Sequence, residues 1–219
     1  MPYPPAPWNL QGYSLQSLHL LDIDCVRPYI PADLHIFSVF PGKTLGGVYI
    51  SSYGIGSTLQ YNELIVVSAL IWEAGKIGSW ISHIYVDHPD SVAGGREIWG
   101  LPKQEAEFIW NIGNTPTVEV RYGTESLCTL SSYGQLPGWQ QAVTIPAFGL
   151  LNTKLLFFEA KADLKLQFAN VKLTVPTESR LSDLKLGQPL LGAYANSLQL
   201  LVQAPTVAKE ISLVSESVI

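Results

Sequence analysis

The sequence has little charge, few arginines and few cysteines, and these shortages exclude several classes of protein. Only 14% of the 219 residues are charged while 47% are hydrophobic. A disordered chain is therefore excluded, because disorder requires low hydrophobicity and high net charge. The net charge of −5 and the presence of four arginines leave no basic stripe for nucleic acid.

Signals for membranes and secretion are also missing. The longest apolar run, residues 64–72 with Ser68 inside it, is about half of the roughly 20 residues that a spanning helix needs. Residues 1–8 are rich in proline and lack the features of a signal peptide. The two cysteines, Cys25 and Cys128, are expected to be buried free thiols, with a single disulfide as the less favoured alternative. We therefore expect a cytoplasmic protein that binds neither a membrane nor nucleic acid.

Most of the sequence shows the pattern of side chains that is typical of β-strands. Residues 160–168 alternate between apolar and polar side chains, which is typical of a strand with one wet face. Residues 63–72 are nearly continuously apolar, as expected for a strand covered on both faces. The strands predicted in this way span residues 15–22, 46–52, 63–72, 80–86, 118–122, 160–168, 171–175 and 197–204.

Helix signals are fewer. They predict helices over residues 90–99 and 179–185 and a short helical segment over residues 25–30. No repeat or low-complexity linker divides the chain, so we expect one domain over residues 1–219. The predicted fold is mainly β (α+β): a closed or partly closed antiparallel barrel with a few short helices, since closure removes exposed edges.

Common cofactor and metal motifs are not found. The four histidines have no metal-ligand spacing, and His83 and His88 would point in different directions. The Gly54-Ile55-Gly56 step lacks the third glycine of a dinucleotide-binding loop and is interpreted as a hairpin turn. We expect no metal and no cofactor.

The segment from Gly94 to Gln104 stands out because glycines, an Arg-Glu pair and a Pro-Lys step fall within eleven residues. Gly95 and Gly100 are expected to bracket a short helix, with Gly100 in the left-handed conformation that ends it. Lys103 then follows an apolar stretch. Desolvation of a lysine favours the free amine, which is a nucleophile, although a surface lysine on a turn is the more common case.

This segment resembles the lysine motif of the acetoacetate decarboxylase family, in which the lysine forms a Schiff base with a keto acid. Gly95, Arg96, Glu97, Pro102 and Lys103 match that motif. The Tyr61-Asn62-Glu63 step resembles a second family motif, whose glutamate lies in the active-site pocket. The resemblance is local in the first half of the chain and only architectural in the second.

The resemblance assigns roles to eight residues. It implies that Lys103 and Glu63 are catalytic, and that Arg96 and Glu97 are buried and bonded to backbone groups so that they aim Lys103. The residues expected to contact the substrate are Tyr61, Trp99, Leu101 and Gln104. The resemblance also implies a homo-oligomer.

Three positions depart from the family pattern. Gln104 replaces the second lysine that follows the reactive one in the family, so activation of Lys103 would depend on the apolar pocket alone. Gly12 and Val48 stand where a loose alignment places an arginine and a second glutamate. A buried carboxylate without a partner is unfavourable by several kcal/mol. The pattern therefore favours an aldehyde, a ketone or a larger hydrophobic carbonyl compound over acetoacetate.

Three functions remain open at this point. The first is a lysine-dependent lyase that acts on a keto acid or other carbonyl compound, by decarboxylation or by aldol-type or dehydratase-type chemistry. The second is a non-catalytic protein that holds a hydrophobic small molecule in the same pocket. The third is an assembly protein.

Overall fold

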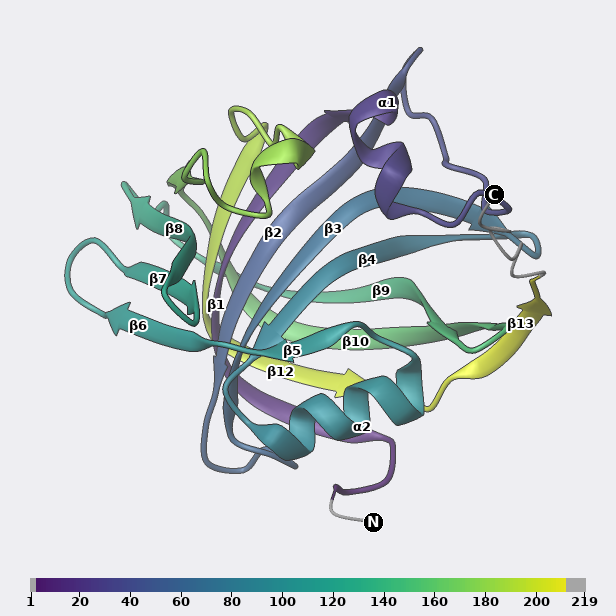
Figure 1. Cartoon of the computed structure of the whole chain (residues 1–219). Coiled ribbons are helices and arrows are strands. Elements are labelled where there is room, and N and C mark those ends of the chain that lie inside the picture. Colours follow the sequence, from purple (N-terminus) through teal and green to yellow (C-terminus); the bar gives the residue numbers. More distant parts are fainter. Residues whose placement is uncertain (1–2, 212–219) are drawn as a thin grey trace.

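The chain folds around one strongly curved sheet that closes on itself. In the computed structural model, which describes residues 3–211, strands β12, β1, β2, β3, β4, β9 and β10 pair in that order, and β10 pairs with β12 to complete the ring (Figure 1). The predicted antiparallel barrel is therefore confirmed, with one exception to the antiparallel pattern: β4 and β9 run parallel and pair at two positions, Ser79 with Ala147 and Trp80 with Phe148.

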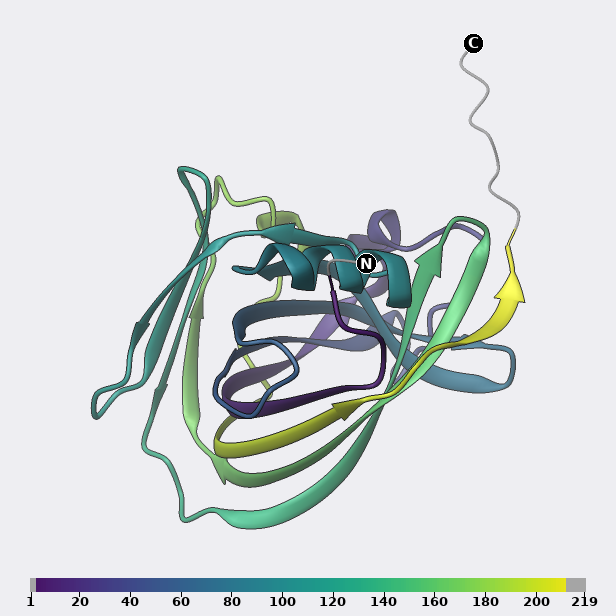
Figure 2. The ribbon, with the colours of Figure 1, turned by 90° about the horizontal axis from the view of Figure 1, so that it is seen from below.

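A second, four-stranded sheet in the order β11-β8-β7-β6 lies outside the ring (Figure 2). The strands of the structure are β1 (Trp8–Asp22), β2 (Lys43–Tyr53), β3 (Tyr61–Glu73), β4 (Lys76–Val86), β5 (Lys103–Glu105), β6 (Glu107–Asn111), β7 (Thr117–Tyr122), β8 (Glu125–Tyr133), β9 (Trp139–Leu151), β10 (Lys154–Phe168), β11 (Asn170–Thr174), β12 (Leu191–Val202) and β13 (Thr206–Glu210). The helical elements are α1 (Ile23–Val26), η1 (Arg27–Tyr29), α2 (Pro89–Trp99) and η2 (Ser182–Leu184).

Helix α2 has clear local causes at both ends. The His88 side chain accepts a hydrogen bond from the Asp90 amide, and Pro89 occupies the first turn, where its missing N–H is not needed. Gly100 ends the helix with a φ of 65°, as predicted from its position. Gly95 lies inside the helix and not at its start, so the expected bracketing by two glycines was wrong.

The prediction of a helix over residues 179–185 was also wrong. The structure has only the three-residue turn η2 there. The Ser179 hydroxyl donates to the Leu127 carbonyl and accepts from the Leu181 amide, which offers the backbone an alternative to a helix. Lys185 then adopts a left-handed φ of 46°, which stops any continuation.

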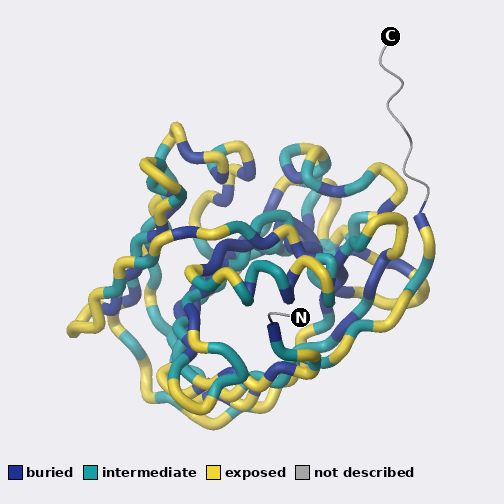
Figure 3. The backbone as a smooth tube through the Cα atoms, turned by 60° about the horizontal axis from the view of Figure 1, so that its bottom comes forward, coloured by how far each residue is buried: buried dark blue, intermediate teal, exposed yellow. Residues whose placement is uncertain are grey.

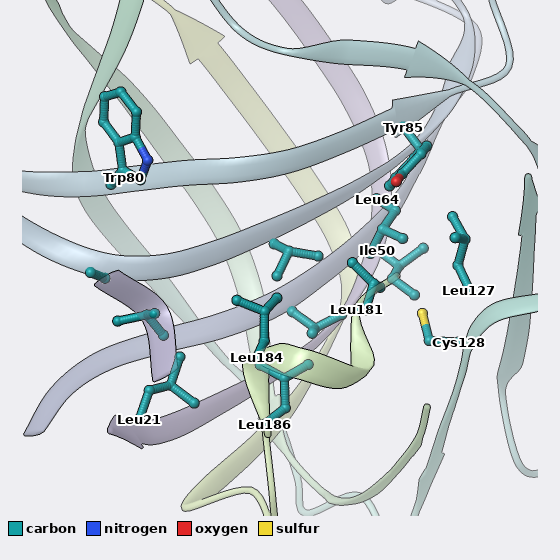
Figure 4. Close-up of a cluster of buried hydrophobic side chains, with 14 of the residues drawn as sticks. Leu21, Ile50, Leu64, Trp80, Tyr85, Leu127, Cys128, Leu181, Leu184 and Leu186 are labelled. Atoms are coloured by element: carbon teal, nitrogen blue, oxygen red, sulfur yellow. The ribbon is translucent and has the colours of Figure 1, made fainter. Parts of the chain in front are cut away.

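The packed core lies between the outer face of the barrel and the second sheet. Ile50 and Leu64 on the barrel belong to one buried cluster with Leu127 and Cys128 on β8, and the loop that carries Leu181 and η2 joins the same cluster (Figure 4). Cys25 and Cys128 are both free thiols; Cys128 is buried, as expected, whereas Cys25 is only half-buried.

Strand β3 was expected to be packed on both faces, but its inner face borders a cavity. The inward residues Ile65 and Val67 pack against a second, smaller buried cluster that includes Trp99 and Phe158, and they also line the cavity. No helix among residues 3–211 is long and apolar enough to span a membrane.

Candidate active site in the barrel cavity

Lys103 points into the barrel from the short strand β5. This strand pairs in parallel with β4, with Lys103 opposite Ile84, another inward-facing residue. The residue is only 3% exposed. The sequence-based interpretation of Lys103 as a buried lysine is thus confirmed, and the more common alternative of a surface lysine is excluded.

The ammonium group of Lys103 has two side-chain partners. Its Nζ donates to Glu63 Oε1 at 2.7 Å and to Ser91 Oγ at 3.0 Å. The Glu63 side chain is also buried, so the two charges form an ion pair shielded from water. The two groups lie close enough for a proton to pass directly between them.

Helix α2 positions Lys103 from behind. A Cβ atom at Gly95 would lie 2.4 Å from Lys103 Cδ, so the helix can approach the lysine stem only because residue 95 is glycine. Ser91 lies one turn earlier on the same helix face. Arg96 Nε donates to the Lys103 carbonyl at 2.7 Å and so fixes the backbone of β5.

The predicted support by Arg96 is therefore present, although the residue is exposed and not buried. Glu97 is also exposed, and it accepts a hydrogen bond from the Tyr3 hydroxyl at 2.5 Å. Its contact ties the N-terminal segment to α2 and does not reach Lys103. In Figure 3 this segment and the helix lie together across one end of the barrel.

Three tyrosines extend the polar group around Glu63. The Tyr53 hydroxyl donates to Glu63 Oε2 at 3.2 Å and lies 3.1 Å from the Tyr49 hydroxyl. The Tyr61 ring centroid is 5.0 Å from Lys103 Nζ, a cation–π distance. Burial raises the pKa of Tyr49 to about 12, and burial together with the nearby charge of Glu63 raises the pKa of Tyr61 well above its ordinary value. The tyrosines are therefore neutral hydrogen-bonding groups at neutral pH.

These side chains border a cavity of about 550 Å³ inside the barrel. Of the predicted substrate contacts, Tyr61, Trp99 and Leu101 line it. Gln104 does not: it follows Lys103 on β5 and faces the opposite side of the strand, because side chains alternate. The structure thus does not bring Gln104 to the site.

The cavity wall has two charged residues, Lys103 and Glu63, and no arginine among the described residues that line it. Gly12 lies outside the lining, and a Cβ atom there would fall 1.8 Å from the Ser52 carbonyl oxygen. No side chain fits at position 12 without a backbone shift. Val48 is part of the outer core cluster and also borders the cavity, but its side chain is apolar. Neither position supplies a charge to the cavity, whatever the alignment.

Sequence reasoning missed Ser91, Tyr53, Tyr49 and Trp8. The spacing of Ser91 and Gly95, four residues apart on one helix, was a usable signal, since such residues share a helix face. Tyr49 and Tyr53 likewise share one face of a strand. Trp8 gave no local signal, because the long-range course of the N-terminal segment brings it to the site, with its ring centroid 5.7 Å from Lys103 Nζ.

Comparison with known proteins identifies the family of the chain. The family model of acetoacetate decarboxylase matches residues 1–156, which is more than half of the chain. The chain therefore belongs to the acetoacetate decarboxylase family. The matched part includes β1 to β5 and helix α2, and so contains Glu63, Ser91 and Lys103.

Two similar plant proteins share the name NEOXANTHIN-DEFICIENT 1. The protein from Arabidopsis thaliana is 31% identical over 114 residues, which is 52% of this chain and 40% of that protein. The protein from Solanum lycopersicum is 32% identical over 114 residues, which is 52% of this chain and 38% of that protein. The chain thus matches less than half of the length of these relatives.

Solved structures show the same fold across nearly the whole chain. An acetoacetate decarboxylase structure superimposes with a TM-score of 0.78 at 15% identity and covers 97% of this chain and 93% of its own. The enzyme from Legionella pneumophila gives 0.77 at 16% identity, covering 96% and 90%. The enduracididine biosynthesis enzyme MppR, in complex with pyruvate, gives 0.71 at 14% identity, covering 95% and 93%.

Proposed function

We propose that this protein is an imine-forming enzyme in which Lys103 attacks the carbonyl carbon of an uncharged small molecule. The observation that carries the proposal is the buried Lys103–Glu63 pair, 2.7 Å apart, on an otherwise apolar cavity wall. An amine and an adjacent base are the parts that carbonyl condensation requires. The complex of MppR with pyruvate shows that this fold accommodates a small carbonyl compound in another member.

The first step transfers a proton from the Lys103 ammonium to Glu63. The free amine then forms a C–N bond with the carbonyl carbon, and the C=O π electrons move to oxygen. One proton passes from the attacking nitrogen to this oxygen and gives a neutral carbinolamine. Glu63 returns its proton as the carbinolamine hydroxyl leaves as water. The product is a protonated imine, which accepts electrons from a bond to the adjacent carbon and so allows C–C cleavage or formation.

Neighbouring groups hold this pair in place. Ser91 accepts a hydrogen bond from Lys103 Nζ, and Tyr53 donates one to Glu63. Both contacts fix the direction of the lone pair that attacks the substrate. Arg96 is a positioning residue, since it acts on the Lys103 backbone and not on the reacting atoms.

The apolar wall argues against a keto acid. A carboxylate in this cavity would have no arginine to pair with, and its desolvation would be unfavourable. Decarboxylation is therefore the family reaction that the site supports least, and aldol-type or dehydratase-type chemistry on a neutral carbonyl compound uses the same lysine.

The proposal is tested by reductive trapping. The protein is incubated with a neutral aldehyde and borohydride, digested and mapped by mass spectrometry. We expect Lys103 to gain the mass of the aldehyde less one oxygen at a concentration that leaves the exposed Lys161 unmodified. In Glu63→Gln, which keeps the side-chain shape but removes the base, trapping at Lys103 should be at least about tenfold slower. Equal modification of Lys103 and Lys161 would refute the proposal.

A second function is favoured by the same apolar lining: a protein that holds a hydrophobic ligand without turnover. It predicts that an apolar molecule binds tightly while Lys103 is never trapped. We further propose a single domain over residues 1–219 that works in the cytoplasm as a homo-oligomer. Cell fractionation and light scattering of the purified chain test these last points.

A further inference from the structure

The polarity of the cavity changes along its length. The charged pair Lys103 and Glu63 and the phenols of Tyr53 and Tyr61 gather at one end. Most other lining side chains are aliphatic or aromatic, and the remaining polar ones, Gln16, Ser17, Ser79 and Gln141, carry no charge. Reactive chemistry is thus confined to one end of a mostly apolar chamber.

The strand directions place the two ends far apart. Strand β3 runs from Tyr61 at the reactive end to Leu70, which lines the cavity near the other end of the same strand. Nine residues of strand span roughly 30 Å, or roughly 20 Å along the axis of a barrel with tilted strands. A ligand that occupies this chamber is elongated.

One end of the cavity is covered, and four residues of its lining are exposed to solvent. At the reactive end, α2 and the N-terminal segment lie across the barrel, and Trp8 and Trp99 are buried there (Figure 3). The exposed residues of the lining are all aliphatic: Leu18 and Val143 are each 38% exposed, Ile145 is 42% exposed and Leu191 is 44% exposed. We call these four residues the rim; Leu18 and Leu191 are direct partners in the β1–β12 ladder.

The barrel seam accounts for part of this exposure. Strands β4 and β9 are paired only where Ser79 meets Ala147 and Trp80 meets Phe148, among the described residues. The part of β9 that carries Val143 and Ile145 precedes this contact and pairs with β10 alone. Apolar side chains that line both the cavity and the surface provide a path by which a hydrophobic chain enters or protrudes.

We infer that the cavity takes a long, uncharged carbonyl compound head first, with its carbonyl at Lys103 and its hydrocarbon tail along the barrel to the rim. This inference rests on the proposed function for its carbonyl and on the cavity lining for its tail. A charged tail is excluded because the wall beyond Glu63 and Lys103 offers no ionic partner. The ligand class is that of long-chain aldehydes and ketones, and not of short keto acids.

The test compares aldehydes of different length. Butanal, nonanal and hexadecanal are supplied from cyclodextrin, trapped with borohydride, and quantified at Lys103. Each methylene that leaves water raises affinity up to about fourfold, so the half-saturating concentration should fall at least ~50-fold from butanal to nonanal and further to hexadecanal. Pyruvate should trap Lys103 poorly. Equal half-saturation for butanal and hexadecanal, or efficient trapping by pyruvate, would overturn the inference.

Rim variants locate the tail. Val143→Thr/Ile145→Thr keeps β-branched side chains on β9 but makes the rim polar. It should raise the half-saturating concentration of hexadecanal at least ~10-fold while leaving that of butanal within about twofold. The matched control is Val207→Thr, since Val207 is 56% exposed on β13 and lies outside the cavity lining. An equal effect of both variants on hexadecanal would contradict a tail at the rim.

A carbonyl-free ligand separates this inference from the proposed function. 1-Hexadecanol has the same tail and cannot form an imine, and its binding is followed through the fluorescence of Trp8 and Trp99, which line the cavity. If no aldehyde traps Lys103 but hexadecanol binds and the rim variant weakens it, the imine chemistry fails and the elongated apolar site holds. If hexadecanol does not bind, the inference fails even where short aldehydes trap Lys103.

Discussion

The two faces of β3 are made of alternating residues of one short stretch, yet they end in different environments. Leu64 and Val66 point outward and are fully buried against the second sheet. Glu63, Ile65 and Val67 point inward and border the cavity. The outer face thus contributes fully buried packing, whereas the inner face packs only in part, against Trp99 and Phe158, and leaves space for a ligand. We conclude that the stability of the protein and its proposed chemistry depend mainly on different faces of the same strands.

The largest expected effect on the free energy of unfolding comes from the inner face, because a buried ion pair lies there. Replacing Lys103 with methionine should lower the free energy of unfolding by about 3–5 kcal/mol, because Glu63 stays buried without its partner. The double variant Lys103→Met/Glu63→Gln should recover most of this loss, since no buried charge remains. Urea denaturation at pH 7 measures both variants. A double variant no more stable than the single one would show that the ion pair does not govern stability here.

The next effect compares two adjacent residues of opposite faces. Leu64→Ala should lower the free energy of unfolding by about 2–5 kcal/mol, because it opens a void in a packed core. Ile65→Ala should lower it by less than about half as much, since Ile65 is only half-buried and already faces empty space. The same denaturation assay decides between them. Equal losses would mean that the barrel interior is packed as tightly as the outer core.

Acid should lower the free energy of unfolding through the titration of His83. Burial, with a smaller contribution from Arg180, lowers the pKa of His83 to about 4, while a histidine in the unfolded chain titrates near its ordinary pKa of 6.5. The unfolded chain therefore binds more protons between these values, so stability is complete above about pH 6.5 and is lost as the pH falls toward 4. The loss from this residue is at most about 3 kcal/mol, and less after solvent screening.

The matched variant for this prediction is His83→Gln, which removes the titrating ring. The curve of stability against pH should be flatter for His83→Gln between pH 6.5 and 4 than for the parent. A second buried histidine, His19, keeps some slope, because burial also lowers its pKa. Identical slopes in parent and variant would contradict the assignment to His83.

The smallest effect tests the polar group of the inner face. Tyr53→Phe removes the hydroxyl that donates to Glu63, at a cost of about 1 kcal/mol in the free energy of unfolding. It should also slow aldehyde trapping at Lys103, because Glu63 loses a contact that orients it. The conservative control is Tyr13→Phe, whose hydroxyl belongs to a tyrosine outside the cavity lining. A trapping rate that is equal in the two variants would remove Tyr53 from the site.

Much of the fold could be predicted from local pattern. The alternation of residues 160–168 and the apolar run of residues 63–72 predicted β10 and β3, since strand side chains alternate with a period of two. Strand β9 was missed because two glutamines, one threonine and Pro146 interrupt its apolar residues. Strand β5 was missed because three residues carry no periodicity, and its pairing with β4 is a tertiary contact.

For the site, the sequence alone predicted that Lys103 and Glu63 share one pocket, because the string from Gly95 to Lys103 and the Tyr61-Asn62-Glu63 step resemble two motifs of one family. Only the tertiary structure decided that they touch, that Ser91 and Tyr53 complete the group, and that Gln104 does not. The physical reason is that chain closure brings distant strands together: Glu63 and Lys103 lie 40 residues apart and meet at 2.7 Å. The cavity likewise depends on which residues face inward from all the strands of the barrel. No single segment of the sequence contains that information.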